Sequence, residues 1–377
     1  MRLSRFWAVA RKELLHILRD PRSLAMGIAI PMLLLVLFGY ALTLDVDDVP
    51  LVVWDQSGTP GSRELLSGFD GSRYFSLRAF VGGYDEIEWA IDHGDALMAV
   101  VIPADLGRAT GTGLEPAVQI LVDGSDSNTA ATAIGYAENV VRRWSQEIAL
   151  ERLRRSGGRT VHLPLEVRSR VWFNADMESR NYIIPGLIAV IMMVIAALLT
   201  SLTVAREWET GTMEQVVSTP LKGPELILGK FLPYFGIGLL DVALAVLTGA
   251  FVFDVPLRGS VPLLFGMAAV FLTGALALGL VISIVTKGQL LASQLAMVLT
   301  FLPAFLLSGF MYDIGNMPRP IQVVTHLVPA RYFVALLKGI YLKGVGLEVL
   351  APQALLLAAF SVVMLTIATI KFRKNLE

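Results

Sequence analysis

The sequence has no cysteine among its 377 residues, which excludes disulfide bonds, thiolate metal sites and cysteine nucleophiles. Histidine is scarce as well, because only four occur and they do not share the spacing of a metal site. The formal net charge is −1. That balance argues against a nucleic-acid-binding protein, which needs an excess of Lys and Arg. We therefore expect no metal site and no nucleic-acid partner.

A phosphate-binding loop is also absent from the sequence. The stretch 223–230 has five residues between its glycines, and Phe231 follows its lysine where a Mg²⁺-binding Ser or Thr belongs. Residues 307–310, Leu-Ser-Gly-Phe, do not form an ATPase signature loop either. We therefore expect no catalytic residues and no cofactor on this chain, which is not expected to be an enzyme.

Apolar residues are abundant, since hydrophobic side chains make up 55% of the chain and charged ones 17%. They form uncharged or nearly uncharged runs, each long enough for a helix to cross a bilayer, which takes about 20 residues. The runs that we assign to transmembrane helices are 23–44, 182–205, 226–253, 261–286, 289–312 and 349–370. The first is too long for a signal peptide, because it would make about 33 Å of helix. The expected fold is a polytopic α-helical membrane protein with six transmembrane helices.

Lysine and arginine are distributed unevenly between the two ends of these runs. Residues 1–22 carry six of them between apolar residues at a three-to-four spacing, which is typical of an amphipathic helix in the membrane interface. Further basic residues on the same side are Arg206, Lys222, Lys230, Lys287, Lys371, Arg373 and Lys374. The short loop 254–260 on the other side has only Arg258. By the positive-inside rule, both termini, including the tail 371–377, are cytoplasmic in a bacterial inner membrane.

Residues 45–178 differ sharply in composition from the apolar runs around them. The segments of strand composition are 49–54, 74–80, 97–102, 117–122 and 165–173, and the helical stretches are 62–69, 84–93 and 128 to about 155. This alternation predicts an α/β domain inserted between the first and second spans. The orientation places it outside the cytoplasm. It lacks a nucleophile–base or metal constellation, so we expect it to do no chemistry.

The long helix of this domain carries an apolar stripe at heptad spacing. Its members are Ala130, Ile134, Ala137, Val141, Trp144 and Ile148. Such a stripe packs either on the domain's own sheet, which is the commoner arrangement, or on a partner such as a periplasmic adaptor protein.

A charged segment, 206–225, is held between the second and third runs and must lie at a membrane face. Thr212 and Gln215 have the spacing of a capping box, and Pro220 ends the short helix that they would begin. One side of that helix would be apolar, with Met213, Val216 and Val217, and the other acidic. The simpler interpretation is a solvated connector between two spans.

The pattern R-E-W-E-x-G-T-M-E-Q-V-V-x-T-P over residues 206–220 resembles the cytoplasmic coupling segment of type-2 ABC exporter permeases. The N-terminal residues that resemble the same family are Arg11, Lys12, Glu13, Arg19, Asp20 and Pro21. The hairpin 313–348 and the residues just before it resemble its last external hairpin, for which we expect two short helices, partly re-entrant. The residues there that we assign to an external gate are Ser308, Gly309, Pro318, Pro329, Arg331 and Tyr332.

The resemblance implies a permease subunit that moves a lipophilic or amphipathic, drug-like molecule outward, since the size of the insert is similar to that of the drug-export branch. In this family ATP and Mg²⁺ bind a separate ABC ATPase subunit, which docks on the coupling segment. The residues thereby assigned to ATPase coupling are Arg206, Glu207, Gly211, Thr212, Met213, Glu214, Gln215, Val216, Val217 and Pro220. Six spans make half a pathway in this family, so a dimer with a second copy or a paralogue is implied.

Asp241 stands in the middle of the third run, where a carboxylate facing lipid costs at least about 2.5 kcal/mol. It would contact substrate, bond across the dimer, or pair locally with Thr200 or Ser201. The residues of the fifth span that would continue a translocation path are Gln289, Ser293 and Thr300. Hydrogen bonding between helices is the alternative role for these three.

Two other classes of function fit part of the sequence. An ion-coupled secondary transporter needs several buried carboxylates or histidines, and only Asp241 qualifies. A membrane-anchored receptor that binds a ligand through residues 45–178 needs fewer spans and no coupling helix. An ABC exporter permease accounts for more of the pattern than either.

Overall fold

The computed structural model describes residues 3–42, 47–108, 117–155, 172–174 and 178–372. The chain forms two compact units. The larger, helical unit combines Met1–Leu44 with Arg170–Glu377, and the smaller unit is Asp45–Ser169.

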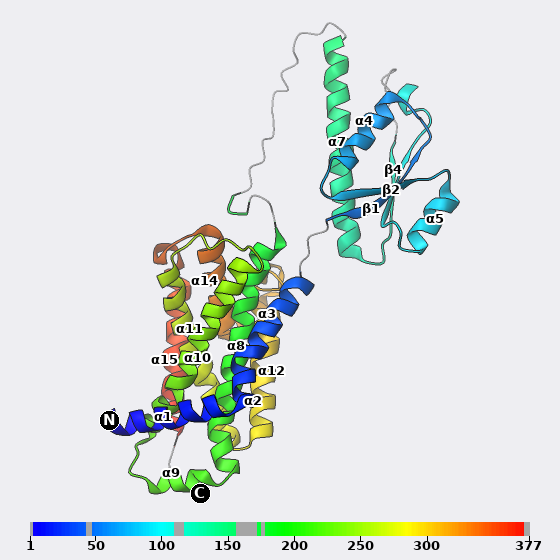
Figure 1. Ribbon diagram of the computed structural model, residues 1–377. Coiled ribbons are helices and arrows are strands. Elements are labelled where there is room, and N and C mark those ends of the chain that lie inside the picture. The colour runs from blue at the N-terminus through cyan, green and yellow to red at the C-terminus, as the bar shows by residue number, and fades with distance from the viewer. Residues whose placement is uncertain (1–2, 43–46, 109–116, 156–171, 175–177, 373–377) are drawn as a thin grey trace. The chain divides into compact units, whose positions relative to one another are not determined.

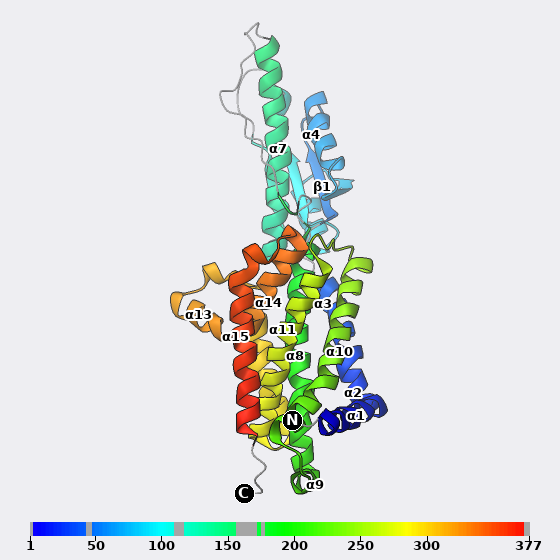
Figure 2. The ribbon, with the colours of Figure 1, turned by 90° about the vertical axis from the view of Figure 1, so that its left-hand side faces the viewer.

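The helical unit is a bundle of long helices with shorter ones at its two ends (Figures 1 and 2). Its first helices are α1 (Leu3–Arg19), α2 (Pro21–Leu24), the π-helical turn η1 (Ala25–Ala29) and α3 (Ile30–Ala41). The next are α8 (Ser179–Glu209), α9 (Thr212–Ser218), α10 (Gly223–Phe251), α11 (Val261–Thr286) and α12 (Gln289–Leu307). The last are η2 (Ile314–Asn316), α13 (Arg319–Val324), η3 (Thr325–Leu327), α14 (Pro329–Lys338), η4 (Gly339–Lys343) and α15 (Leu347–Lys371).

Five of the described helices, α8, α10, α11, α12 and α15, are long and apolar enough to cross a membrane. The pair Arg319–Leu327 and Pro329–Lys343 is bent by 89° and would make a sixth crossing segment if it acts as one broken span. The run expected to be the first span contains a shorter apolar helix, Ala25–Ala41. At 1.5 Å per residue it reaches only about 25 Å, less than the roughly 30 Å of a bilayer core. The described residues therefore supply five or six candidate spans.

Helix α8 is the centre of the bundle, because 94% of its most apolar stretch is buried by other helices. It crosses α11 closely at Gly279, where an added Cβ would lie 2.1 Å from Oγ1 of Thr200. The Thr200 hydroxyl donates to the Leu276 carbonyl oxygen at 2.9 Å across this crossing. A motion of α8 must therefore move its neighbours as well.

Helix α1 lies across one end of the bundle, nearly at right angles to the long helices (Figure 1). Its inner face is buried, while the apolar side chains of Leu3, Trp7, Leu14 and Leu18 are exposed. This is the pattern of a helix that rests in a membrane interface. Helices α9 and α1 and the end of α15 share this end, which we name the α9 end, and α14 lies at the other, the α14 end (Figure 1).

The smaller unit is built on a four-stranded sheet of order β2-β1-β3-β4. Its strands are β1 (Val49–Asp55), β2 (Phe75–Phe80), β3 (Met98–Ile102) and β4 (Gln119–Val122). Strand β1 pairs in parallel with β2 and β3, and β4 pairs antiparallel with β3. Its helices include α4 (Pro60–Asp70), α5 (Tyr84–Asp92) and α7 (Ser127–Arg155). Four expected strands thus lie within two residues of observed ones, and most of the fifth, 165–173, falls outside the described residues.

The apolar stripe of α7 packs on the unit's own sheet. Ala137 and Trp144 are buried in one core with strand and α4 side chains, and Val141 and Ile148 pack against it. Only Ile134 of the stripe is well exposed, at 38%. The stripe therefore stabilises this unit and gives no support to an adaptor contact.

Candidate functional site

A cluster of buried charges joins three helices at the α9 end of the bundle. Nζ of Lys230, from α10, lies 2.8 Å from Oε1 of Glu13 on α1 and 2.9 Å from Oε1 of Glu207 on α8. All three side chains are buried, Lys230 to 1% exposure. Nζ of Lys12 adds a second cation 2.9 Å from the same Glu207 oxygen. We name these four residues the ion cluster.

The ion cluster holds together groups that would be costly to bury singly. An unpaired ion loses several kcal/mol of solvation on burial, and close opposite charges offset that loss. Lys12 is partly exposed and lies outside the apolar spans. Burial lowers its pKa, but the hydrogen bond to Glu207 and the charges of Glu207 and Glu13 raise it more, so the net pKa is above the usual value. Lys12 is therefore charged at neutral pH.

Local packing brings α1 and α10 close enough for these contacts. A Cβ at Gly229 would lie 2.8 Å from Cβ of Val9, so glycine permits the close crossing. Two further side-chain contacts join α1 to other segments at the α9 end. An Arg5 guanidinium N–H donates to the Pro220 carbonyl oxygen at 2.5 Å, and NH1 of Arg206 lies 2.7 Å from Nε2 of His16.

A cavity of about 580 Å³ opens beside the ion cluster. All four cluster residues line it, together with Thr212 and Gln215 of α9. Oε2 of Glu207 is buried and has no hydrogen-bond partner among the described residues. The Glu207 carboxylate therefore has one buried oxygen that no described residue satisfies.

Helix α9 differs from its expected form in two respects. Thr212 is its first residue, after Gly211 in the left-handed region at φ +72°. The Thr212 hydroxyl donates to the Glu207 carbonyl oxygen at 3.4 Å instead of capping Gln215. Met213 is 1% exposed and packs inside this chain, in a cluster with side chains of α1, α10 and α15. The apolar side of this helix therefore places Met213 inside this chain, and its assignment to ATPase coupling stays a prediction.

The polar side of α9 is open. Glu214 and Gln215 are exposed, whereas the side chains of Val216 and Val217 lie outside the described part of the chain. A capping contact does occur at the next helix, where Oε2 of Glu225 accepts from the Lys222 N–H at 3.0 Å.

The N-terminal residues singled out from the sequence fall into two groups. Lys12 and Glu13 belong to the ion cluster, and Oδ2 of Asp20 lies 3.7 Å from NH1 of Arg206. Arg11 and Arg19 are exposed, and Pro21 begins α2.

The residues expected to line a translocation path are not brought together as a set. Asp241 is 1% exposed, and its Oδ1 has no partner among the described residues. Neither Thr200 nor Ser201 pairs with it, because both hydroxyls donate to carbonyl oxygens. On α12, the hydroxyls of Ser293 and Thr300 bond to their own helix, while Gln289 bonds to Glu209.

Four of the six expected gate residues line a cavity of about 440 Å³ at the α14 end. Ser308, Gly309, Arg331 and Tyr332 line it, and Nζ of Lys338 donates to the Gly309 carbonyl oxygen at 2.8 Å. The two prolines do not line it. Pro318 directly precedes α13, and Pro329 is the first residue of α14.

Comparison with known proteins places this arrangement in a family. Residues 21–370 match the ABC-2 family transporter proteins. The chain belongs to this family. A relative named a probable multidrug ABC transporter permease, YbhS of Escherichia coli K12, is 36% identical over 98% of this chain and 97% of its own length. YbhR of the same strain, with the same description, is 30% identical over 92% of each chain. The inner membrane transport permease YhhJ is 27% identical over 87% of this chain and 86% of its own length.

Within this ABC-2 permease, sequence reasoning missed the residue at the centre of the ion cluster. In the sequence, Lys230 is counted only among the basic residues of the cytoplasmic side. A signal was present, because Lys230 lies within the apolar run 226–253, and an intramembrane ionisable residue needs a partner. That partner could not be identified, since Glu13 lies 217 positions away.

Proposed function

We propose that this permease exports a lipophilic or amphipathic small molecule, driven by ATP hydrolysis on a separate ABC ATPase subunit. Two relatives described as probable multidrug ABC transporter permeases support the substrate class. The permease would act as a dimer, with a second copy or a paralogue, in a bacterial inner membrane. Both termini would be cytoplasmic and the smaller unit external.

The ion cluster is the observation that carries the coupling proposal. It joins α1, α8 and α10 within one network next to α9, whose Glu214 and Gln215 are exposed. An ATPase that pushes on α9 would therefore displace α8, which is the centre of the bundle. Packed helices move as units because close-packed interiors deform little.

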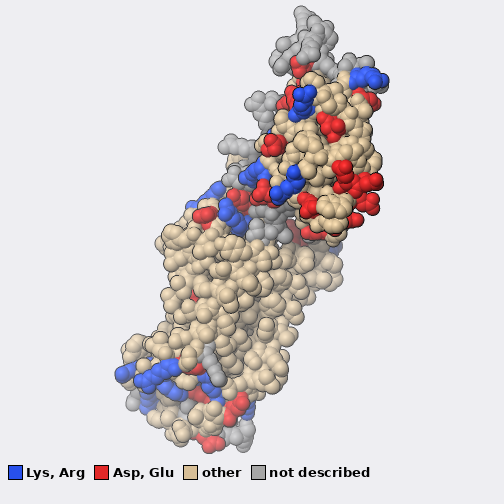
Figure 3. All heavy atoms as spheres, turned by 45° about the vertical axis from the view of Figure 1, so that its right-hand side comes forward, with Lys and Arg blue, Asp and Glu red and all other residues tan. Residues whose placement is uncertain are grey.

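The distribution of charge supports the proposed orientation. The face of the helical unit in Figure 3 is almost free of charge over most of its height, and Lys and Arg, with acidic residues between them, lie at its lower end. Exposed basic residues of α1 include Arg11 and Arg19. The positive-inside rule assigns such an end to the cytoplasm.

The test is ATP-dependent uptake of a lipophilic dye into inside-out vesicles that hold the permease and its partner ATPase. We expect uptake to need both subunits and hydrolysable ATP. As a matched control, vesicles with an ATPase variant that binds but does not hydrolyse ATP should be inactive. Uptake that follows a proton gradient and persists without the ATPase would refute the proposal in favour of a secondary transporter.

A further inference from the structure

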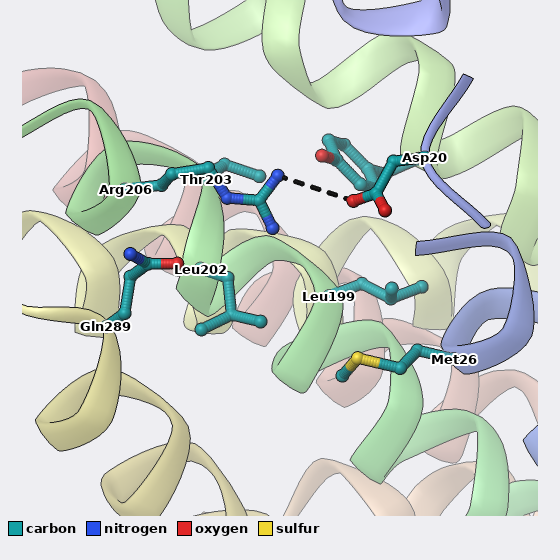
Figure 4. Close-up of a pocket in the computed structure, with 8 residues that line it drawn as sticks. Asp20, Met26, Leu199, Leu202, Thr203, Arg206 and Gln289 are labelled. Carbon is teal, nitrogen blue, oxygen red and sulfur yellow. Dashed lines mark ion pairs between the residues drawn. The ribbon is translucent and has the colours of Figure 1, made fainter. Parts of the chain in front are cut away.

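A second cavity, of about 430 Å³, lies next to the one that holds the ion cluster. Its polar end carries Asp20, Arg206 and Gln289, and its apolar side carries Met26, Leu199 and Leu202 (Figure 4). The residues come from four separate parts of the chain, namely the α1–η1 region, α8, α10 and α12. A cavity with one charged end and one apolar side matches an amphipathic ligand.

The position of the cavity fits a ligand that arrives from the membrane. Asp20 directly follows α1, whose exposed face of Leu14 and Leu18 is suited to the membrane interface. The polar end of the cavity is therefore level with an interfacial helix, where the head groups of amphipathic molecules lie.

Among the described residues that line this cavity, Arg206 is the one cation and Asp20 the one anion. Its NH1 lies 2.7 Å from Nε2 of His16 and 3.7 Å from Oδ2 of Asp20, toward which it points in Figure 4. The guanidinium has five N–H donors, and its Nε and NH2 have no acceptor among the described residues. Planar donors in this arrangement suit a carboxylate, phosphate or sulfate.

We propose that this cavity binds an amphipathic acid, with the anionic head group on Arg206 and the apolar part against Met26, Leu199 and Leu202. The inference deepens the proposed transport function and rests on it only in calling the ligand a substrate. An anionic membrane lipid and an exported amphipathic acid share this chemistry.

A ligand bound in this cavity would also act on the ion cluster. Thr203, Arg206 and Tyr234 line both this cavity and the one beside the ion cluster. Arg206 directly precedes Glu207, which belongs to the ion cluster. An acid that moves the Arg206 guanidinium into the cavity would therefore act on the end of α8 next to the cluster. Bound ligand would in this way change the contacts made by α1 and α8.

The experiment measures binding of fluorescent dodecanoate to the purified full-length permease, without ATPase, in nanodiscs of phosphatidylcholine. We expect saturable binding that Arg206→Gln weakens at least about tenfold, equivalent to about 1.4 kcal/mol. Arg206→Lys should weaken it less, because lysine keeps the positive charge but not the planar donors. Arg319→Gln is the matched control, because Arg319 is exposed on α13 and does not line the cavity. Leu202→Trp should abolish binding by filling the apolar side, with an unchanged unfolding midpoint.

Equal binding of dodecanoate and a dodecylammonium analogue, or wild-type affinity in Arg206→Gln, would overturn the proposal. Phosphatidylglycerol added to the nanodiscs separates the two sources. If phosphatidylglycerol displaces the probe, the site binds anionic lipid; if the probe stays bound, the site is specific for the acid. Both results support binding of an amphipathic anion. A permease that binds the probe, but whose ATPase the probe never stimulates, would keep this binding site while refuting the claim that its ligand is a substrate.

Discussion

Removing Lys230 should be the most damaging single change to the α9 end of the permease. Lys230→Met keeps a long apolar side chain but leaves Glu13 and Glu207 buried without the cation between them. Breaking a buried ion pair by removing one partner costs about 3–5 kcal/mol. Lys12 still lies 2.9 Å from Glu207 and 4.0 Å from Glu13. Because this exposed lysine compensates in part, we expect a loss near the lower end, about 3 kcal/mol.

The assay is the free energy of unfolding of the purified permease, titrated with sodium dodecyl sulfate in mixed micelles. The double variant Lys230→Met/Glu13→Gln removes one uncompensated charge and should be more stable than Lys230→Met alone. Lys371→Met, at an exposed lysine in the last turn of α15, is the control and should stay within about 0.5 kcal/mol of wild type. A loss below about 1 kcal/mol for Lys230→Met, or additivity in the double variant, would show that the cluster is not a coupled network.

Three further changes test other parts of the structure. Glu214→Lys should reduce the amount of ATPase recovered with the permease in a pull-down, without altering permease stability. The control is Glu348→Lys, at an exposed residue at the start of α15, which should recover as much ATPase as wild type. Equal recovery with both variants would mean that α9 is a simple connector. The pKa of Lys12 is raised in the folded state, so its stabilising effect is complete below its unfolded pKa of about 10.4 and is lost as pH rises through the folded value. The difference in unfolding free energy between wild type and Lys12→Met should therefore be constant from pH 6 to 9 and shrink in more alkaline solution. A difference that already changes near pH 7 would contradict this. Gly279→Ala should cost about 1–3 kcal/mol by overpacking the α8–α11 crossing, while Gly266→Ala, in open space on the same helix, should be near neutral; similar losses at both sites would count against a tight crossing.

Glu225, the next acidic residue after Glu214, would be an unsuitable control for Glu214→Lys. Glu225 lies beyond Pro220 and resembles a bystander to α9, but it is 1% exposed and accepts from the Lys222 N–H at the start of α10. Replacing it would disturb α10 itself. An exposed carboxylate such as Glu348 is the better comparison, because its loss leaves no buried donor unsatisfied.

The sequence by itself determined the features that depend on local pattern. Long uncharged runs predict membrane helices because backbone polar groups in lipid must bond within the helix, and five of the six expected runs are long helices in the structure. The alternation of strand and helix residues likewise predicted four strands of the smaller unit. The motif at 206–220 pointed to the family that the relatives show.

Only the tertiary structure decided which residues act together. The sequence places Met213 on the apolar side of α9, and only the fold shows that this side packs into a cluster with α1, α10 and α15. The sequence places Lys230 only among the basic residues of one membrane side, whereas the fold buries it between two carboxylates. A helix pattern specifies which side of each helix is apolar, but not which neighbour meets that side. Charges that are far apart in the chain pair only after packing has removed them from water.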